Sequence, residues 1–242
     1  MAPDGLVLEP REPASGLLDE PFRMHARGAG GEDGLPLTWR ARLRDDEGRV
    51  WRASAERAAE LPAAWAPAKA STGPLAALQS LRPTAIDVRV ESDEDGRVAS
   101  RTVTRRLLAD GVRVRRWRTG LAATLHLPAA ATPCAVVVLD ATGGAEPAAT
   151  AALAAPLLAS RGALVLVVPA GREPSDRLLA AAREQLAAVP AAAGAEAVTI
   201  APLLPPGVPS SSDDDFAARA AAWDGLLETL GAAPREGDAA LR

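Results

Sequence analysis

The residues of this sequence that are best placed for chemistry are an acid and two glycines that follow an apolar run. Asp140 ends the run 136–139, and Gly143 and Gly144 precede a helical stretch. Ligand sites of α/β folds lie beyond the carboxyl ends of parallel strands. Backbone N–H groups at a helix start bind anions and carbonyl oxygens. Asp140 is therefore a candidate catalytic residue, and Gly143 and Gly144 are candidate carbonyl-binding residues. A tight strand-to-helix turn explains the glycines equally well.

The other candidate nucleophile and bases have structural interpretations. Cys134 begins an apolar strand after Pro133, and a buried free cysteine usually behaves as a small hydrophobic residue. His25 and His126 are the only histidines, and both fall in strand-like stretches. We interpret these three residues as structural. Asp140 remains the only catalytic candidate.

An acidic run near the C-terminus raises the question of a metal site. Asp213, Asp214 and Asp215 are consecutive, and carboxylates bind hard cations. However, Ser212 followed three residues later by Asp215 is typical of a helix start, where acids also complement the helix dipole. We interpret the run as a helix cap and predict no metal.

The arginines allow two interpretations. A series in the first half could contact the phosphates of coenzyme A, or it could form a solvated sheet face. Arginine accounts for 26 of the 27 basic residues, and asparagine and tyrosine are absent, as in proteins from GC-rich genomes. Abundant arginine is therefore weak evidence of function, and we favour the solvated face. The series comprises Arg101, Arg105, Arg106, Arg113, Arg115, Arg116 and Arg118.

Composition is that of a globular protein. The 242 residues are 48% hydrophobic and 24% charged, with a net charge of −4, which does not favour nucleic-acid binding. No apolar run is long enough to span a membrane, and the N-terminal sequence does not resemble a signal peptide. A single cysteine excludes an internal disulfide, so we expect a cytoplasmic protein.

The first half predicts an antiparallel β-sandwich over residues 1–128. Residues 37, 39, 41 and 43 are apolar and alternate with polar ones, as in a strand with one buried face. Similar strands are predicted over 86–90, 98–107, 112–114 and 121–127, and acidic turns with glycine are predicted at 45–48 and 93–96. Residues 56–83 are predicted to form a loop with a short helix.

The second half, residues 134–242, predicts a small α/β domain. The runs 134–139 and 163–168 are continuously apolar, which is typical of parallel strands buried on both faces. A helix over 146–160, bent at Pro156, joins them. A second helix leads to a third strand over 197–201. Apolar residues from Phe216 to Leu230 recur at helical spacing, and Gly231 is expected to end that last helix.

In their order, these motifs resemble the acyl-CoA thioesterase / bile acid-CoA:amino acid N-acyltransferase family. That family joins a β-sandwich to an α/β-hydrolase domain. The resemblance extends over roughly residues 5–200 and implies an acyl thioester as ligand. It rests on the segments Leu37–Ala55, Gly73–Leu75, Leu81–Pro83, Asp110–Val112, Leu125–Pro128 and Val136–Gly144.

The chemistry of that family needs a nucleophile, a histidine and an acid. The nucleophile belongs to a glycine-flanked turn between a strand and a helix. Leu203 stands in its place here, Pro205 replaces a glycine, and Pro205 and Pro206 prevent a normal helix start. The family would place its histidine base late in the sequence, just before the final helix. No histidine follows residue 126 here. The domain is therefore expected to be a truncated α/β-hydrolase domain without the triad.

Two functions remain open at this point. The first is a protein that acts by binding an acyl thioester or a partner protein. The second is an active acyl-thioester-processing enzyme that uses Asp140 with Gly143 and Gly144. We favour binding, and we expect no bound cofactor other than an acyl-CoA-type ligand. Because the shortened sheet would leave an edge beside 197–201, we predict a homodimer or a partner protein contacting residues 197–209.

Overall fold

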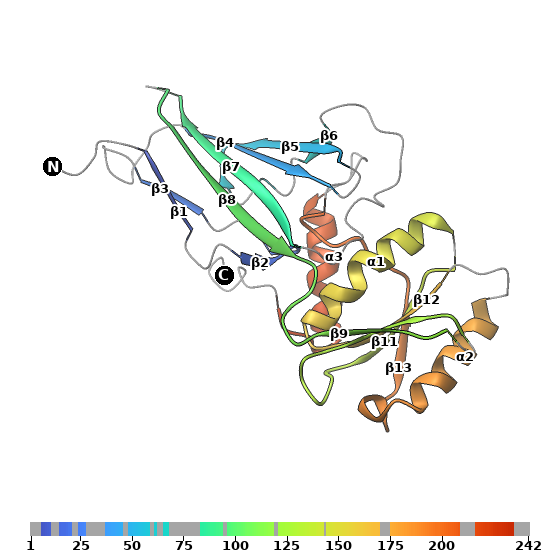
Figure 1. Ribbon diagram of the computed structural model, residues 1–242. Helices are drawn as coiled ribbons and strands as arrows, with labels where there is room; N and C mark the ends of the chain where they lie inside the picture. The colour runs from blue at the N-terminus through green and yellow to red at the C-terminus, as the bar shows by residue number, and fades with distance from the viewer. Residues whose placement is uncertain are drawn as a thin grey trace.

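The computed structural model describes most of the chain, and the described residues form two large sheets, one two-stranded sheet and three α-helices (Figure 1). More of the described residues lie in strands than in helices. The expectation of a mixed α/β protein with additional β-structure is therefore confirmed as a fold class. Most of the predicted loop 56–83, Gly73–Leu75, Gly143 and Asp213–Asp215 lie outside the described residues. The described residues are 6–10, 15–20, 24–27, 37–45, 48–58, 61, 65–67, 83–93, 96–118, 121–142, 144–169, 175–208 and 216–234.

The first sheet has the strand order β2-β8-β7-β4-β5-β6. Its strands are β2 (Ser15–Leu17), β4 (Leu37–Arg44), β5 (Val50–Ala55), β6 (Ala66–Pro67), β7 (Thr84–Ser92) and β8 (Val98–Arg106). The alternation predicted in β4 is confirmed, because Trp39, Ala41 and Leu43 are buried while Arg40 and Arg42 are exposed. β2 pairs parallel to β8, so the sheet is mixed rather than wholly antiparallel.

A two-stranded sheet accompanies the first one. β1 (Val7–Pro10) pairs antiparallel with β3 (Met24–Arg27). Leu8 of β1 is buried in the same apolar cluster as Trp39, Trp51 and Val88 of the large sheet. The two-stranded sheet therefore covers part of the buried face of the large sheet, and the description of this half as a β-sandwich remains a proposal.

The second sheet has the order β13-β11-β12-β10-β9. β11 (Val136–Asp140), β12 (Leu164–Val168) and β13 (Ala197–Ile200) are parallel, as predicted. β9 (Arg113–Arg116) and β10 (Thr124–Leu127) form an antiparallel hairpin that pairs with β12 through β10. The prediction that this hairpin belongs to the sandwich, and that the second sheet has three strands, is therefore wrong. The alternating pattern identified the strands but carries no information about which sheet they join.

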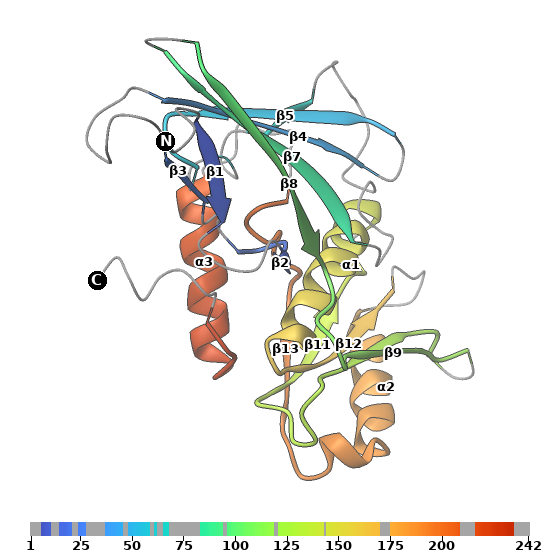
Figure 2. The same cartoon turned by 60° about the vertical axis from the view of Figure 1, so that its left-hand side comes forward.

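Helices cover both faces of the second sheet (Figure 2). α1 (Ala145–Ser160) and α3 (Phe216–Thr229) share one apolar core with Val137 and Leu139 of β11. α2 (Ser175–Ala187) and the short 3₁₀ helix η3 (Pro190–Ala192) pack on the opposite face, against Val136 and Val138. The described helices include none that is long and apolar enough to cross a membrane.

The end of α3 follows the sequence prediction. Gly231 has φ of 62°, a left-handed conformation that favours glycine. The N–H of Gly231 donates to the carbonyl of Glu228, and the N–H of Ala232 donates to that of Leu227. These two bonds satisfy carbonyls that would otherwise lack partners at the helix end.

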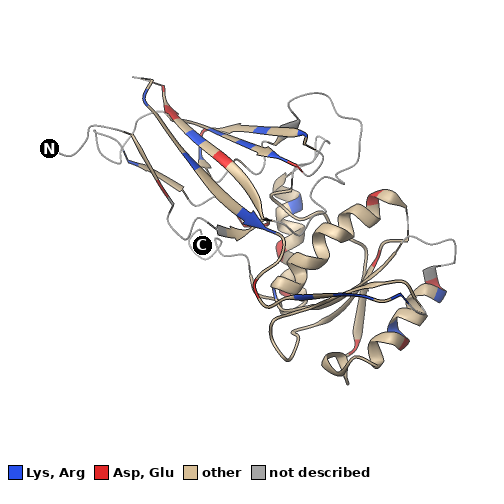
Figure 3. Ribbon diagram, viewed as in Figure 1, with Lys and Arg blue, Asp and Glu red and all other residues tan. Residues whose placement is uncertain are grey.

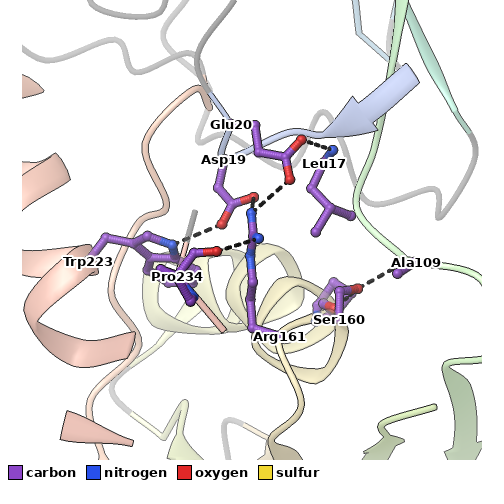
Figure 4. Close-up of polar contacts among 9 residues, drawn as sticks. Leu17, Asp19, Glu20, Ala109, Ser160, Arg161, Trp223 and Pro234 are labelled. Carbon is purple, nitrogen blue, oxygen red and sulfur yellow. Dashed lines mark hydrogen bonds and ion pairs between the residues drawn. The ribbon is translucent and has the colours of Figure 1, made fainter. Parts of the chain in front are cut away.

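A buried polar cluster joins the two halves of the chain (Figure 4). Arg161, directly after α1, donates from Nη2 to Asp19 Oδ1 and to Glu20 Oε1, both at 3.0 Å. Asp19 Oδ2 accepts a hydrogen bond from Trp223 Nε1 of α3 at 3.0 Å. Burial lowers the pKa of Arg105, and the nearby carboxylates of Glu20 and Asp19 oppose that shift. We call Asp19, Glu20, Arg105, Arg161 and Trp223 the clasp.

Candidate functional site

Asp140 lies where the sequence placed it, at the carboxyl end of β11. Its Oδ1 accepts two hydrogen bonds from Thr142, one from the backbone N–H at 3.0 Å and one from the hydroxyl at 2.6 Å. The carboxylate therefore closes the turn that follows the strand. This local role explains an aspartate at the position without requiring proton transfer.

The turn leads directly into α1. Gly144 is the N-cap residue, with φ of 126° and ψ of −161°, a conformation accessible essentially to glycine alone. The first helical hydrogen bond runs from Ala148 N–H to the Gly144 carbonyl at 3.2 Å. The N–H groups of Ala145 and Glu146 precede that bond and so have no acceptor within the helix. This geometry allows a carbonyl oxygen or an anion to bind beside Gly144; Gly143 lies outside the described residues.

The segment after β13 is a packing element. Leu203 and Leu204 are half-buried and contact the core shared by α1 and α3. Pro205 and Pro206 are buried. A Cβ atom at Gly207 would collide with the carbonyl of Leu18, so only glycine fits there. Leu203 and Leu204 thus contribute apolar packing to this core.

The two histidines lie away from the Asp140 turn. His126 is on β10, which β12 separates from β11. Its side chain is only 5% exposed, its Nδ1 is buried without a hydrogen-bond partner among the described residues, and burial lowers its pKa to about 4. His25 belongs to β3, in the other half of the molecule. His126 is therefore buried, not solvent-facing as its alternation with Leu125 and Leu127 had indicated, and neither histidine lies beside Asp140.

Cys134 is equally remote from Asp140. It precedes β11, whose other end carries Asp140, and its backbone N–H donates to the Gly162 carbonyl at 3.0 Å. The side chain is exposed, contrary to the expectation of a buried cysteine. Partial desolvation raises the pKa of its thiol, which lowers the fraction of reactive thiolate.

The predicted arginine series does not form one surface. Arg101 donates to the Leu8 carbonyl, Arg105 belongs to the clasp, and Arg106 pairs with Asp110 at 2.8 Å. Arg113 and Arg115 are exposed on β9, in the second sheet. Figure 3 shows basic residues on strands of both sheets. Neither phosphate binding nor a single solvated sheet face therefore describes the series as a whole. Within the described residues, no three His, Cys, Asp or Glu side chains gather as metal ligands.

The structure adds a groove that sequence reasoning missed. It lies between the β9–β10 hairpin and the end of α2 and has a volume of about 560 Å³. Arg113, Arg115 and Trp117 line one side, over Leu125 and Leu127. The sequence signal for this groove is the alternation of Arg113 and Arg115 that ends at Trp117. This pattern does not show that the end of α2 lies opposite.

No protein-family model matches this chain, and no curated protein matches its sequence. The resemblance to acyl-CoA thioesterases therefore enters the proposal below on the strength of the motifs alone.

Proposed function

We propose that the protein binds an acyl thioester beside Gly144 and does not cleave it through a covalent intermediate. The observation that supports this most directly is the packing of Leu203 against the core at the carboxyl end of the parallel sheet. In the family that the sequence resembles, a nucleophile projects from this position. Here a nucleophile would have to replace a side chain that stabilises the junction of α1 and α3.

The turn after β11 supplies the binding half of the proposal. Ala145 and Glu146 offer backbone N–H groups at the positive end of the α1 dipole, which favours the partially negative oxygen of a thioester. Asp140 is held by Thr142 at the same edge. These bonds give Asp140 a structural role in the turn, and neither histidine lies beside it, so binding is the better-supported function.

Calorimetric titration with decanoyl-CoA tests the proposal. We expect saturable binding by the wild type and a large loss of affinity in Gly144→Ala, because alanine cannot adopt the backbone angles of Gly144. Gly194→Ala is the matched control: Gly194 also has positive φ, at 77°, and lies in the same half of the chain. Equal affinity in both variants, or loss only when Arg113 and Arg115 are replaced, would contradict the site proposed here.

A second candidate function is association with another protein chain, and the end of the second sheet favours it. β13 is the terminal strand of that sheet, as the sequence predicted. Val198 on β13 is 45% exposed, and the strand carries no charged residue. Terminal strands without charges readily pair with a further strand. We propose a second copy of this chain as the partner.

A further inference from the structure

The groove between the β9–β10 hairpin and the end of α2 has the dimensions of a ligand site. Its volume of about 560 Å³ lies within the range of small-molecule pockets, about 300–1,000 Å³. Two separate parts of the chain form its walls. The lining residues are Arg113, Arg115, Trp117, Leu125, Leu127, Gln185, Ala188, Val189, Pro190 and Ala191.

The groove lies on other strands than Asp140: β9 and β10 line it, and β12 separates β10 from β11, which carries Asp140. In the β10–β12 pairing, Thr124 is opposite Val167 and His126 is opposite Val165, so Leu127 comes beside the beginning of β12. Asp140, in contrast, is paired with Val168 at the end of β12. The groove is therefore distinct from the turn at Gly144, and the inference does not depend on the function proposed above.

The floor of the groove is apolar and one wall is cationic. Leu125 and Leu127 are 2% and 6% exposed and form part of the core beneath α2. Across the hairpin, Arg115 is paired with Leu125 and Arg113 with Leu127. Side chains of such pairs lie on the same face, so each arginine stands next to a floor leucine.

Neither arginine is neutralised nearby. Both are exposed, and within the described part of the chain neither forms an ion pair or a hydrogen bond. The half-buried Trp117 follows them along the same wall. Two free guanidinium groups beside an aromatic ring and apolar floor favour a ligand with an acidic head and an apolar body.

The facing wall contains an unmet hydrogen-bond acceptor. Gln185 on α2 lines the groove, and its Oε1 is buried without a partner among the described residues. Because that oxygen has almost no accessible surface, a ligand in the groove does not contact it in this conformation, and the indication of a ligand comes from the arginines and the apolar floor.

We propose that the groove binds an amphipathic anion. A carboxylate, sulfonate or phosphate group pairs with Arg113 and Arg115, while the apolar body covers Leu125, Leu127 and Trp117.

Two fluorescent probes with the same aromatic body test this proposal. Anilinonaphthalene sulfonate carries the acidic group, whereas phenylnaphthylamine lacks it, and both retain an N–H. We expect the double variant Arg113→Gln/Arg115→Gln to lose about tenfold or more in affinity for the sulfonate, because hydrogen bonds to charged groups are strong. Its affinity for the neutral probe is expected to be unchanged.

The matched control is Arg42→Gln/Arg44→Gln, which removes the same charge from two exposed arginines at the same spacing on β4. We expect it to bind both probes like the wild type. Ala188→Trp, which fills the groove from an exposed position, is expected to exclude both probes. Equal loss of the sulfonate in the two double variants, or undiminished binding by a folded Ala188→Trp protein, would overturn the proposal.

Discussion

Arg161 and Asp19 form a buried ion pair at 3.0 Å, although they are 142 positions apart in the sequence. Their side chains are 5% and 0% exposed. Asp19 follows β2 of the first sheet, and Arg161 follows α1 of the second half. Arg161 also donates to the carbonyl of Pro234 at 2.9 Å. This pair thus joins the N-terminal segment, α1 and the C-terminal segment at one point.

Removing Arg161 is predicted to destabilise the whole fold. Arg161→Ala breaks the buried ion pair with Asp19 by removing one partner, a change that typically costs about 3–5 kcal/mol. Urea unfolding measures this loss. Arg40→Ala is the control, because the Arg40–Glu91 pair at 2.9 Å is exposed, and such pairs contribute about 1 kcal/mol at most. Similar losses in the two variants would contradict the role assigned to the clasp.

The stability of the protein is predicted to depend on His126 in mildly acidic solution. Burial lowers the folded-state pKa of His126 from 6.5 to about 4. Between these pH values the unfolded chain binds a proton there and the folded chain does not. Stability therefore falls as the pH decreases from 6.5 to about 4, by about 3 kcal/mol from this residue alone.

His126→Leu tests that contribution by removing the titrating group. Urea unfolding of the variant and the wild type is compared at several pH values across this interval. Between pH 6.5 and about 4, the free energy of unfolding of the variant is expected to fall less than that of the wild type. The difference should equal the contribution attributed to His126. Two curves that run parallel across the interval would show that His126 does not contribute in this way.

The terminal strand β13 is predicted to mediate a homodimer. Val198→Lys introduces a charge on the exposed strand, which opposes pairing with a second copy. Light scattering over a dilution series is expected to show a dimer for the wild type and a monomer for this variant. Val98→Lys is the control, because Val98 is similarly exposed, at 42%, on the first sheet. A wild type that is monomeric throughout, or equal dissociation of both variants, would refute the interface.

Local elements of this fold follow from its sequence. The alternation around Trp39 places the core of β4, the continuous runs 136–139 and 164–168 give adjacent parallel strands, and Gly231 ends α3. Each of these signals is contained in a short stretch of sequence, because side-chain period and backbone conformation are local properties.

The parts that the sequence did not predict depend on distant partners. The alternating pattern of β9 and β10 predicts two amphipathic strands that would fit either sheet. Only the pairing of β10 with β12 places them in the second sheet. Asp19 and Arg161 are single charged residues without a local pattern. The groove likewise forms only where the end of α2 meets β9 and β10, which are distant in sequence. The Asp140 turn was predicted because its acid and glycine lie within a few residues.

Release of free coenzyme A from decanoyl-CoA tests the central claim most directly. The reaction is followed with a thiol-specific chromogenic reagent under conditions in which calorimetry shows the protein to be saturated. The account predicts binding with release no faster than in buffer, and no acylated protein by mass spectrometry. Saturable release that is abolished in a folded Asp140→Asn variant, or an acyl adduct on the chain, would contradict it.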